Sequence, residues 1–170
     1  MAAGEHGTRP HAVPRDVEIP NDTLVVIDMG ALVDGYCSDC TRTLATGSPG
    51  DAALEIYELV LRAQTEALAA TRAGAQNKDV DAVAREIIDA AGHADHFGHG
   101  LGHGVGLEVH EGPRLGKTAE GALEAGNAVT VEPGVYLPGE FGVRIEDLVI
   151  VTGGEPRILT GFPKGLVTIG

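Results

Sequence analysis

The sequence predicts an α+β fold, with antiparallel strands at both ends of the chain and helices between them. Alternating apolar segments flank Asp34-Gly35 near the start and Pro138-Gly139 near the end, which is typical of hairpins. Two stretches with helical apolar spacing separate the hairpins. A chain of 170 residues fits one domain, so we expect a single domain over residues 1–170.

The composition is that of an ordinary globular chain, and it excludes some classes of protein. With 43% hydrophobic and 22% charged residues, disorder is not expected. Apolar stretches fall short of the roughly 20 residues of a membrane span, and the first residues lack a signal-peptide core. We therefore expect a cytoplasmic protein with no membrane contact. The net charge of −13 and the scattered Lys and Arg argue against nucleic-acid binding.

The first expected element is a hairpin from Thr23 to Ala45 that turns at Asp34-Gly35, a pair typical of type I′ turns. A two-residue turn places Asp39 opposite Gly30, and Asp28 becomes its diagonal neighbour on the same face. Diagonal neighbours lie roughly 7–8 Å apart at the backbone. Two carboxylates at this separation can bracket cations.

Two helices follow. Ser48 as N-cap and Pro49 at the first helical position predict a helix that runs to about Arg72. A second helix is expected after Asn77, with Gly92 as its C-terminal stop. Apolar and amide side chains share one face of each helix, at Tyr57, Leu61, Gln64 and Leu68 in the first and at Val80, Val83, Ala84, Ile87, Ile88 and Ala91 in the second.

A segment rich in glycine and histidine, HADHFGHGLGHGVGLEVHEGP, comes next and is expected to be a loop leading into a strand. His99 and His103 have a spacing that would suggest a zinc site on a helix, but the glycines around them exclude the helix. Such glycines allow the backbone to approach a site or substrate closely. A lone loop histidine is more often a surface residue, and the density of histidines here favours a site.

The final hairpin carries Glu132 and Glu146 on two strands around Pro138-Gly139, and its register makes the two glutamates face each other. Like charges directly opposite destabilise a sheet unless something neutralises them. The competing interpretation is that these glutamates are exposed acidic residues on half-polar strands. It explains a single carboxylate better than it explains carboxylate pairs in two hairpins.

Four carboxylates carry a charge that two divalent cations would offset, with a bridging hydroxide to complete the coordination. Oxygen ligands with one imidazole suit Mn²⁺ best, and Co²⁺, Fe²⁺ or Zn²⁺ are possible substitutes. Arg144 shares a face with Glu146 and is predicted to hold a metal-binding carboxylate in place, unless it forms a plain surface ion pair. Thr41 and Thr43 either support the site similarly or simply favour the strand.

Cys37 and Cys40 form a C-x-x-C pattern, which could indicate a redox pair or half of a zinc site. Residues three apart on an extended strand point to opposite faces, so the two thiols would not meet. Because Cys is among the most often buried residue types, we expect both to be structural.

These residues resemble those of the pita-bread metallopeptidases, a family that includes methionine aminopeptidase, Xaa-Pro aminopeptidase and Xaa-Pro dipeptidase. The matching segments are IDMGALVDGYCSDCTRT, HGLGHGVGLEVHEGP, VEPGVYLPGEFGVRIED and, more weakly, RPHAVP. The resemblance implies a curved antiparallel sheet with covering helices. It also implies a dinuclear metal site whose ligands are Asp28, Asp39, His103, Glu132 and Glu146, with Asp39 and Glu146 bridging both metals.

The resemblance further implies attack of a metal-bridging hydroxide on the scissile carbonyl, with Glu132 as proton shuttle and His110 stabilising the intermediate. His11, His99 and His110 match histidines that line the substrate site, and Arg144 matches an arginine that supports the ligands. The segments look more like those of the proline-specific enzymes than of methionine aminopeptidase. The expected substrate is a short peptide cleaved before proline, and the choice between dipeptidase and aminopeptidase stays open.

The chain begins almost at the RPH segment, whereas family members carry helices and a strand before it and usually a separate N-terminal domain. We therefore expect an N-terminally incomplete catalytic domain whose uncovered edge favours a homodimer. Three alternatives remain: a metal-free interaction module, a creatinase-like hydrolase, and a fragment that keeps every ligand without the scaffold for catalysis. The intact ligand set disfavours the first two but does not address the third.

Overall fold

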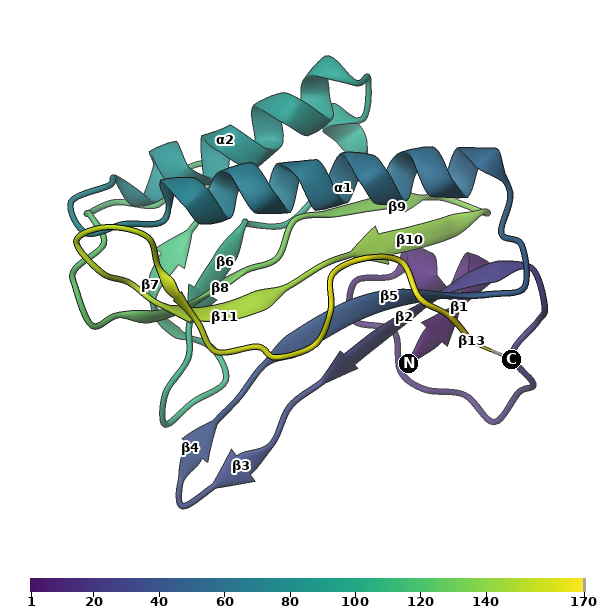
Figure 1. The fold of residues 1–170 in the computed structure, drawn as a ribbon, viewed down its shortest axis with the longest axis horizontal. Coiled ribbons are helices and arrows are strands. Elements are labelled where there is room, and N and C mark those ends of the chain that lie inside the picture. The colour runs from purple at the N-terminus through teal and green to yellow at the C-terminus, as the bar shows by residue number, and fades with distance from the viewer. Residues whose placement is uncertain (170) are drawn as a thin grey trace.

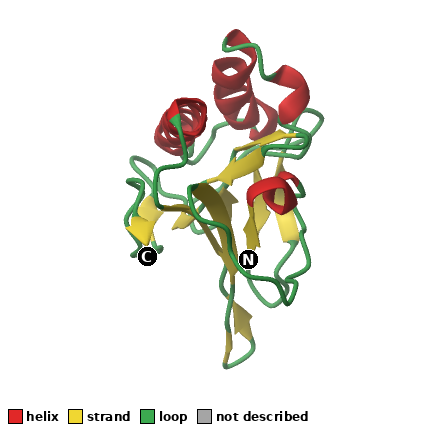
Figure 2. Ribbon diagram, turned by 90° about the vertical axis from the view of Figure 1, so that its right-hand side faces the viewer, coloured by secondary structure: helices red, strands yellow, loops and turns green. Residues whose placement is uncertain are grey.

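Two helices lie side by side over one side of curved, mainly antiparallel sheets, as Figure 1 shows for the computed structural model, which describes residues 1–169. This confirms the expected α+β class, with strands toward both ends of the chain. The hairpin of β3 (Leu32–Val33) and β4 (Tyr36–Cys37) projects away from the layers (Figure 2). A 3₁₀ helix precedes the main strands and another follows the helices; these are η1 (Gly4–Thr8) and η2 (Ala94–His96).

The helices are α1 (Asp51–Ala70) and α2 (Asn77–Ala90). Their apolar faces pack on the sheets, α1 against β8 (Ala128–Val131), β9 (Gly134–Leu137) and β10 (Phe141–Arg144), and α2 against β7 (Glu111–Leu115). The predicted cap of the first helix was wrong. Gly50, with φ of 86°, occupies the N-cap position, and its carbonyl accepts the first helical hydrogen bond from Leu54. Ser48 lies two residues before this cap, where its amide donates to Oδ1 of Asp22.

The first hairpin has the predicted register. Asp34 and Gly35 have φ angles of 50° and 86°, as a type I′ turn requires, and Asp28 pairs with Thr41. The ladder is interrupted near Asp39, so the hairpin consists of an outer and an inner pair of strands. The outer pair, β2 (Thr23–Met29) and β5 (Cys40–Thr46), forms one sheet with the edge strands β1 (Ala2–Ala3) and β13 (Thr168–Ile169). The inner pair, β3 (Leu32–Val33) and β4 (Tyr36–Cys37), forms a separate two-stranded sheet.

The second hairpin also keeps its predicted register, since Leu137 pairs with Phe141 near the turn and Val131 with Asp147 farther out. Each expected strand is broken at the glutamate that it carries, and the break separates an inner pair from a larger sheet. The strands are β8 (Ala128–Val131), β9 (Gly134–Leu137), β10 (Phe141–Arg144) and β11 (Asp147–Ile150), with β12 (Arg157–Ile158) beside β11.

Part of the glycine-rich segment is a strand, which corrects the expectation of a loop. β6 (Gly102–Gly104) lies between β7 (Glu111–Leu115) and β8, with His103 at its centre. A Cβ atom at Gly102 would collide with the carbonyl of Thr130, and one at Gly104 with that of Gly112. Glycine is therefore needed on both sides of His103 to let three strands pack this closely.

The two hairpins meet along a seam between β5 and the β10–β11 region. The amide of Glu146 donates to the carbonyl of Thr41 over 3.1 Å, and the hydroxyl of Thr43 bonds both the amide and the carbonyl of Arg144. All four residues are buried. This seam brings the carboxylates of the two hairpins together. In the part of the chain that is described, the helices are too short or too polar to cross a membrane.

Candidate metal centre

Five potential ligands from both hairpins and β6 converge at the seam. Oxygens of Asp28, Asp39 and Glu146 all lie within 4.8 Å of one another, and so do ligand atoms of His103, Glu132 and Glu146. Glu146 belongs to both groups. This arrangement offers two adjacent positions for cations that share one carboxylate. A further group, Asp39 with His103 and His110, meets the same criterion.

Glu146 is the most deeply buried of these residues, with 1% of its surface exposed. Its Oε2 accepts a hydrogen bond of 2.7 Å from the Thr41 hydroxyl, while Oε1 has no hydrogen-bond partner within residues 1–169. Burial, followed by the charges of Glu132 and Asp39, raises its pKa well above the usual value. A buried, unpartnered carboxylate oxygen is costly, and a cation would satisfy it.

The pKa values of Asp39 and Glu132 are shifted in opposite directions. Burial and the neighbouring charges of Asp28 and Glu132 raise the pKa of Asp39 to about 6. For Glu132, burial acts in the same upward direction, but the hydrogen bond and charge of His103 outweigh it and lower the pKa. Oε1 of Glu132 lies 3.0 Å from Nε2 of His103, whose pKa rises because of this contact in spite of burial. Glu132 is therefore held as the anion.

Arg144 connects both hairpins on the face that carries the ligands. Its Nη2 lies 2.6 Å from Oδ2 of Asp28, and its Nε donates to the hydroxyl of Thr41 over 3.0 Å. Thr41 in turn donates to Glu146. Arg144 thus contacts Asp28 directly, lies 3.9 Å from Oε2 of Glu132 through its Nε, and reaches Glu146 through Thr41. It is therefore a buried link among three carboxylates and not a surface ion pair.

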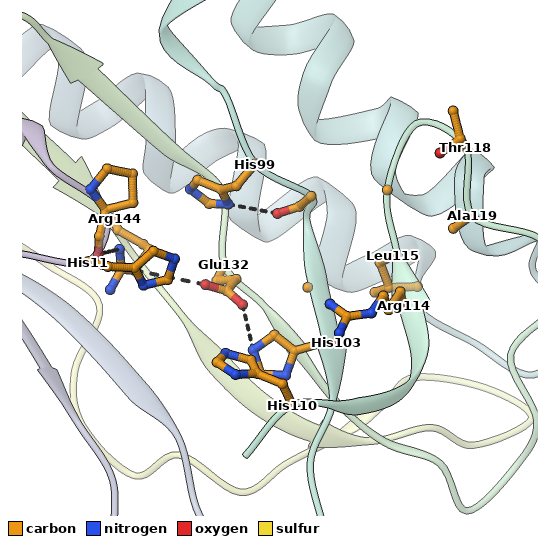
Figure 3. Close-up of a pocket in the computed structure, with 14 residues that line it drawn as sticks. His11, His99, His103, His110, Arg114, Leu115, Thr118, Ala119, Glu132 and Arg144 are labelled. Carbon is orange, nitrogen blue, oxygen red and sulfur yellow. Dashed lines mark hydrogen bonds and ion pairs between the residues drawn. The ribbon is translucent and has the colours of Figure 1, made fainter. Parts of the chain in front are cut away.

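A cavity of about 440 Å³ opens beside the carboxylates and is lined by imidazoles. Figure 3 shows His11, His99, His103 and His110 around Glu132. The rings of His103 and His110 are 4.3 Å apart at their centroids. Burial lowers the pKa of His99, and burial with the charge of His103 lowers that of His110. Neutral imidazoles can donate or accept a hydrogen bond from a substrate, so the cavity suits a peptide.

Tyr136 and Arg114 belong to the site but were not predicted from the sequence. The hydroxyl of Tyr136 lies 3.0 Å from both Nε2 of His99 and Nη1 of Arg144. Tyr136 stands two residues beyond Gly134 and four beyond Glu132, so the strand period could have indicated its face. Arg114 lines the cavity as an exposed cation. Its position depends on the β6–β7 pairing, which the sequence did not predict.

Helix α2 fixes the segment that carries His99. The guanidinium of Arg85 donates to the carbonyls of Phe97 and His99 and pairs with the buried Asp81. Asp81 also accepts from the amide of Leu101. The helix therefore anchors both ends of the segment Phe97–Leu101. Sequence periodicity showed only the apolar face of this helix.

The cysteines lie apart from this chemistry, which agrees with a structural role. Both are free thiols; Cys40 is buried and Cys37 is half-buried. Burial raises the pKa of Cys40 to about 11, so its thiol stays protonated at neutral pH. Neither appears in a group of potential metal ligands among the described residues.

The donor set fits divalent cations on the observations of this structure. Four clustered carboxylates, one of them buried with an oxygen that no described residue satisfies, present more negative charge than Arg144 and His103 offset. Carboxylate oxygens with one imidazole are donors that Mn²⁺ accepts readily. The curved sheets, the covering helices and this cluster define the class of pita-bread folds with a candidate metal centre.

Comparison with known proteins places the chain within this class. Residues 1–153 match the family described as Metallopeptidase family M24. The chain belongs to this family.

Among its relatives is the Xaa-Pro dipeptidase of Pyrococcus furiosus, 48% identical over 167 residues that cover 98% of this chain and 48% of the relative. The solved X-Pro aminopeptidase of Thermotoga maritima is 41% identical with a TM-score of 0.95, over 99% of this chain and 48% of that one. The Xaa-Pro dipeptidase of Bacillus anthracis is 45% identical with a TM-score of 0.97, over 99% and 47% of the two chains. This chain thus spans about half the length of the relatives that it matches.

Proposed function

We propose that this chain carries the catalytic centre of a metal-dependent exopeptidase that hydrolyses the peptide bond before proline in short peptides. The observation that carries the proposal is Glu146, which has a buried oxygen without a partner among residues 1–169 and belongs to two groups of potential ligands. The relatives named as Xaa-Pro dipeptidases and X-Pro aminopeptidase support the proline specificity.

Two divalent cations would be held by Asp28, Asp39, His103, Glu132 and Glu146, with Asp39 and Glu146 shared between them. When bound, the cations would polarise the scissile carbonyl and lower the pKa of a water molecule. Mn²⁺ suits these donors best, and Co²⁺, Fe²⁺ or Zn²⁺ are possible substitutes.

The side chains around the cations supply the proton transfers and the binding of the peptide. Glu132, held as the anion, accepts a proton from the attacking water at a carboxylate oxygen and delivers it to the departing proline nitrogen. His110 donates a hydrogen bond to the substrate carbonyl as negative charge develops there, while His99, whose ring nitrogens bond Gly100 and Tyr136, lines the substrate site beside it. His11 lines the same cavity and contacts the bound peptide. Arg114 offers a cation to the C-terminal carboxylate of a short peptide.

The test is an assay of the purified protein with Mn²⁺ against Ala-Pro, a longer Xaa-Pro peptide and a Met-initiated peptide. We expect cleavage of one or both proline substrates and its loss in Asp39→Ala, with Asp95→Ala on the exposed turn of η2 as the matched control. Preference for the Met-initiated peptide would favour methionine aminopeptidase-like specificity. Turnover that survives Asp39→Ala would contradict the metal mechanism.

A second candidate is a domain that binds the cations without turnover, favoured by the fact that the chain spans about half the length of its relatives. Binding of Mn²⁺ without cleavage of any of the three peptides would support it. A homodimer in the cytoplasm stays a prediction, and sedimentation of the purified protein tests the dimer.

A further inference from the structure

The seam between the two hairpins has a second face, opposite the one that carries the candidate metal ligands. The buried guanidinium of Arg42 holds this second face. Arg42 follows Thr41 on β5, so its side chain points away from the metal centre. Its Nη1 donates to the carbonyl of Thr41 over 2.9 Å and also to the carbonyl of Glu146. A single side chain therefore joins β5 to the backbone of the most deeply buried candidate ligand.

The same guanidinium pairs with a buried carboxylate. Nη2 of Arg42 lies 2.8 Å from Oδ1 of Asp147, whose side chain is 1% exposed. The other oxygen of Asp147 accepts from Lys164 over 2.8 Å and from the amide of Gln64 over 3.0 Å. Asp147 follows Glu146 directly, so this network fixes the backbone of Glu146 from two sides. The Asp147 carboxylate lies between two positively charged side chains, those of Arg42 and Lys164. Without Lys164, Arg42 and Asp147 would remain as an ion pair with no net charge.

The C-terminal tail completes the network. Nε of Arg42 donates to the carbonyl of Pro163 over 2.9 Å, and Nη2 donates to that of Phe162 over 2.7 Å. The hydroxyl of Tyr57 on α1 donates to the carbonyl of Lys164 over 2.7 Å. The tail then returns along β5 to form β13, as the yellow end of the ribbon shows in Figure 1. The segment Phe162–Lys164 thus orients the guanidinium that spans the seam.

We propose that Arg42, oriented by the segment Phe162–Lys164, is a positioning residue that sets the spacing between Asp39 and Glu146. The inference rests on the proposed function, since it takes these two carboxylates as shared ligands. Asp39 leads directly into β5, three residues before Arg42, while the Glu146 carbonyl is held by the guanidinium itself. Metal sites tolerate ligand displacements of only a few tenths of an ångström, so a shift along the seam weakens binding.

The experiment compares Mn²⁺ affinity, by titration calorimetry, in the unmodified protein, Arg42→Lys, Lys164→Met and Lys78→Met. Lysine keeps the charge of Arg42 but lacks the planar fork that reaches both strands and the tail. Lys78 is exposed on α2 and serves as the matched control. We expect Arg42→Lys to weaken Mn²⁺ binding by about 10–100-fold. Lys164→Met should weaken it by about tenfold, at the lower end of the range for such supporting contacts, and Lys78→Met should leave it unchanged.

The visible absorption of bound Co²⁺ separates positioning from mere stability, because it responds to the arrangement of the ligands in the folded protein. We expect an altered Co²⁺ spectrum in Arg42→Lys at temperatures where the variant is fully folded. If Arg42→Lys does not fold, Lys164→Met decides, and equality with Lys78→Met in affinity and spectrum overturns the inference. Unchanged affinity in a folded Arg42→Lys overturns it as well. Absence of Mn²⁺ binding by the unmodified protein would instead overturn the proposed function and this inference together.

Discussion

Asp28 and Glu146 share one group of candidate ligands, yet they occupy contrasting environments. The Asp28 side chain is 47% exposed, lies on a regular ladder opposite Thr41 and pairs with Arg144. Glu146 is 1% exposed, stands at a break between β10 and β11 and leaves one oxygen without a partner in residues 1–169. The charge of Asp28 in the first hairpin is thus already compensated by solvent exposure and by the Arg144 guanidinium. The charge of Glu146 in the second hairpin is not.

This contrast indicates how the centre divides its tasks. The charge of Glu146 is desolvated and is repelled by Glu132 and Asp39. Of the two carboxylates, Glu146 should therefore contribute more to the binding free energy of a metal ion. The same features make Glu146 a burden on the metal-free fold. Asp28 costs the fold little and contributes to one group of ligands only. Substitutions in the two hairpins should therefore differ in both metal content and stability.

The largest effect is expected for Glu146→Gln. The variant should lose both cations, and peptidase activity should fall by more than about 100-fold, because a direct ligand matters more than the residues that support it. The metal-free variant should unfold at the same temperature as the unmodified protein or higher, since the amide removes repulsion from Asp39 and Glu132. Activity assays with Mn²⁺ and thermal unfolding in a chelator measure the two outcomes. Marked destabilisation of the metal-free variant would contradict this account of Glu146.

A smaller effect is expected for Asp28→Asn. Only the group of Asp28, Asp39 and Glu146 loses a charged ligand, so one cation should remain with His103, Glu132 and Glu146. Elemental analysis of the dialysed variant should find half the metal content of the unmodified protein. If Asp28→Asn loses as much metal as Glu146→Gln, the proposed contrast between the hairpins is wrong.

The smallest of these effects is expected for Thr41→Val, which removes the hydroxyl between Arg144 and Glu146 without changing the shape of the side chain. Mn²⁺ affinity should fall by about tenfold. The free energy of unfolding should fall by about 1–3 kcal/mol, because the second oxygen of Glu146 also loses its partner. Thr65→Val, on the exposed face of α1, is the control. Denaturant unfolding and titration that show no difference between the two variants would refute the role given to Thr41.

The registers of both hairpins could be predicted because each depends on a short turn. Positive φ angles at Asp34, Gly35 and Gly139 are local requirements that residue type reveals, and a two-fold strand period then places the carboxylates. The approach of the two hairpins could not be predicted this way. It depends on the seam between Thr41 and Glu146, which are far apart in the sequence.

The wrong predictions involved contacts between distant residues. Ser48 is a residue type typical of N-caps, but its amide donates a hydrogen bond to Asp22, and the helix begins after Gly50. The segment around His103 has the composition of a loop, but its glycines serve close strand packing against Thr130. In both cases a local propensity yields to a partner that the sequence does not identify.

The measurement that tests the central claim most directly is the number of Mn²⁺ ions bound by the unmodified chain, determined by titration calorimetry and by elemental analysis after dialysis. The account predicts two ions per chain, because Glu146 joins two groups of ligand atoms. A single ion, or none, in the folded protein would contradict it.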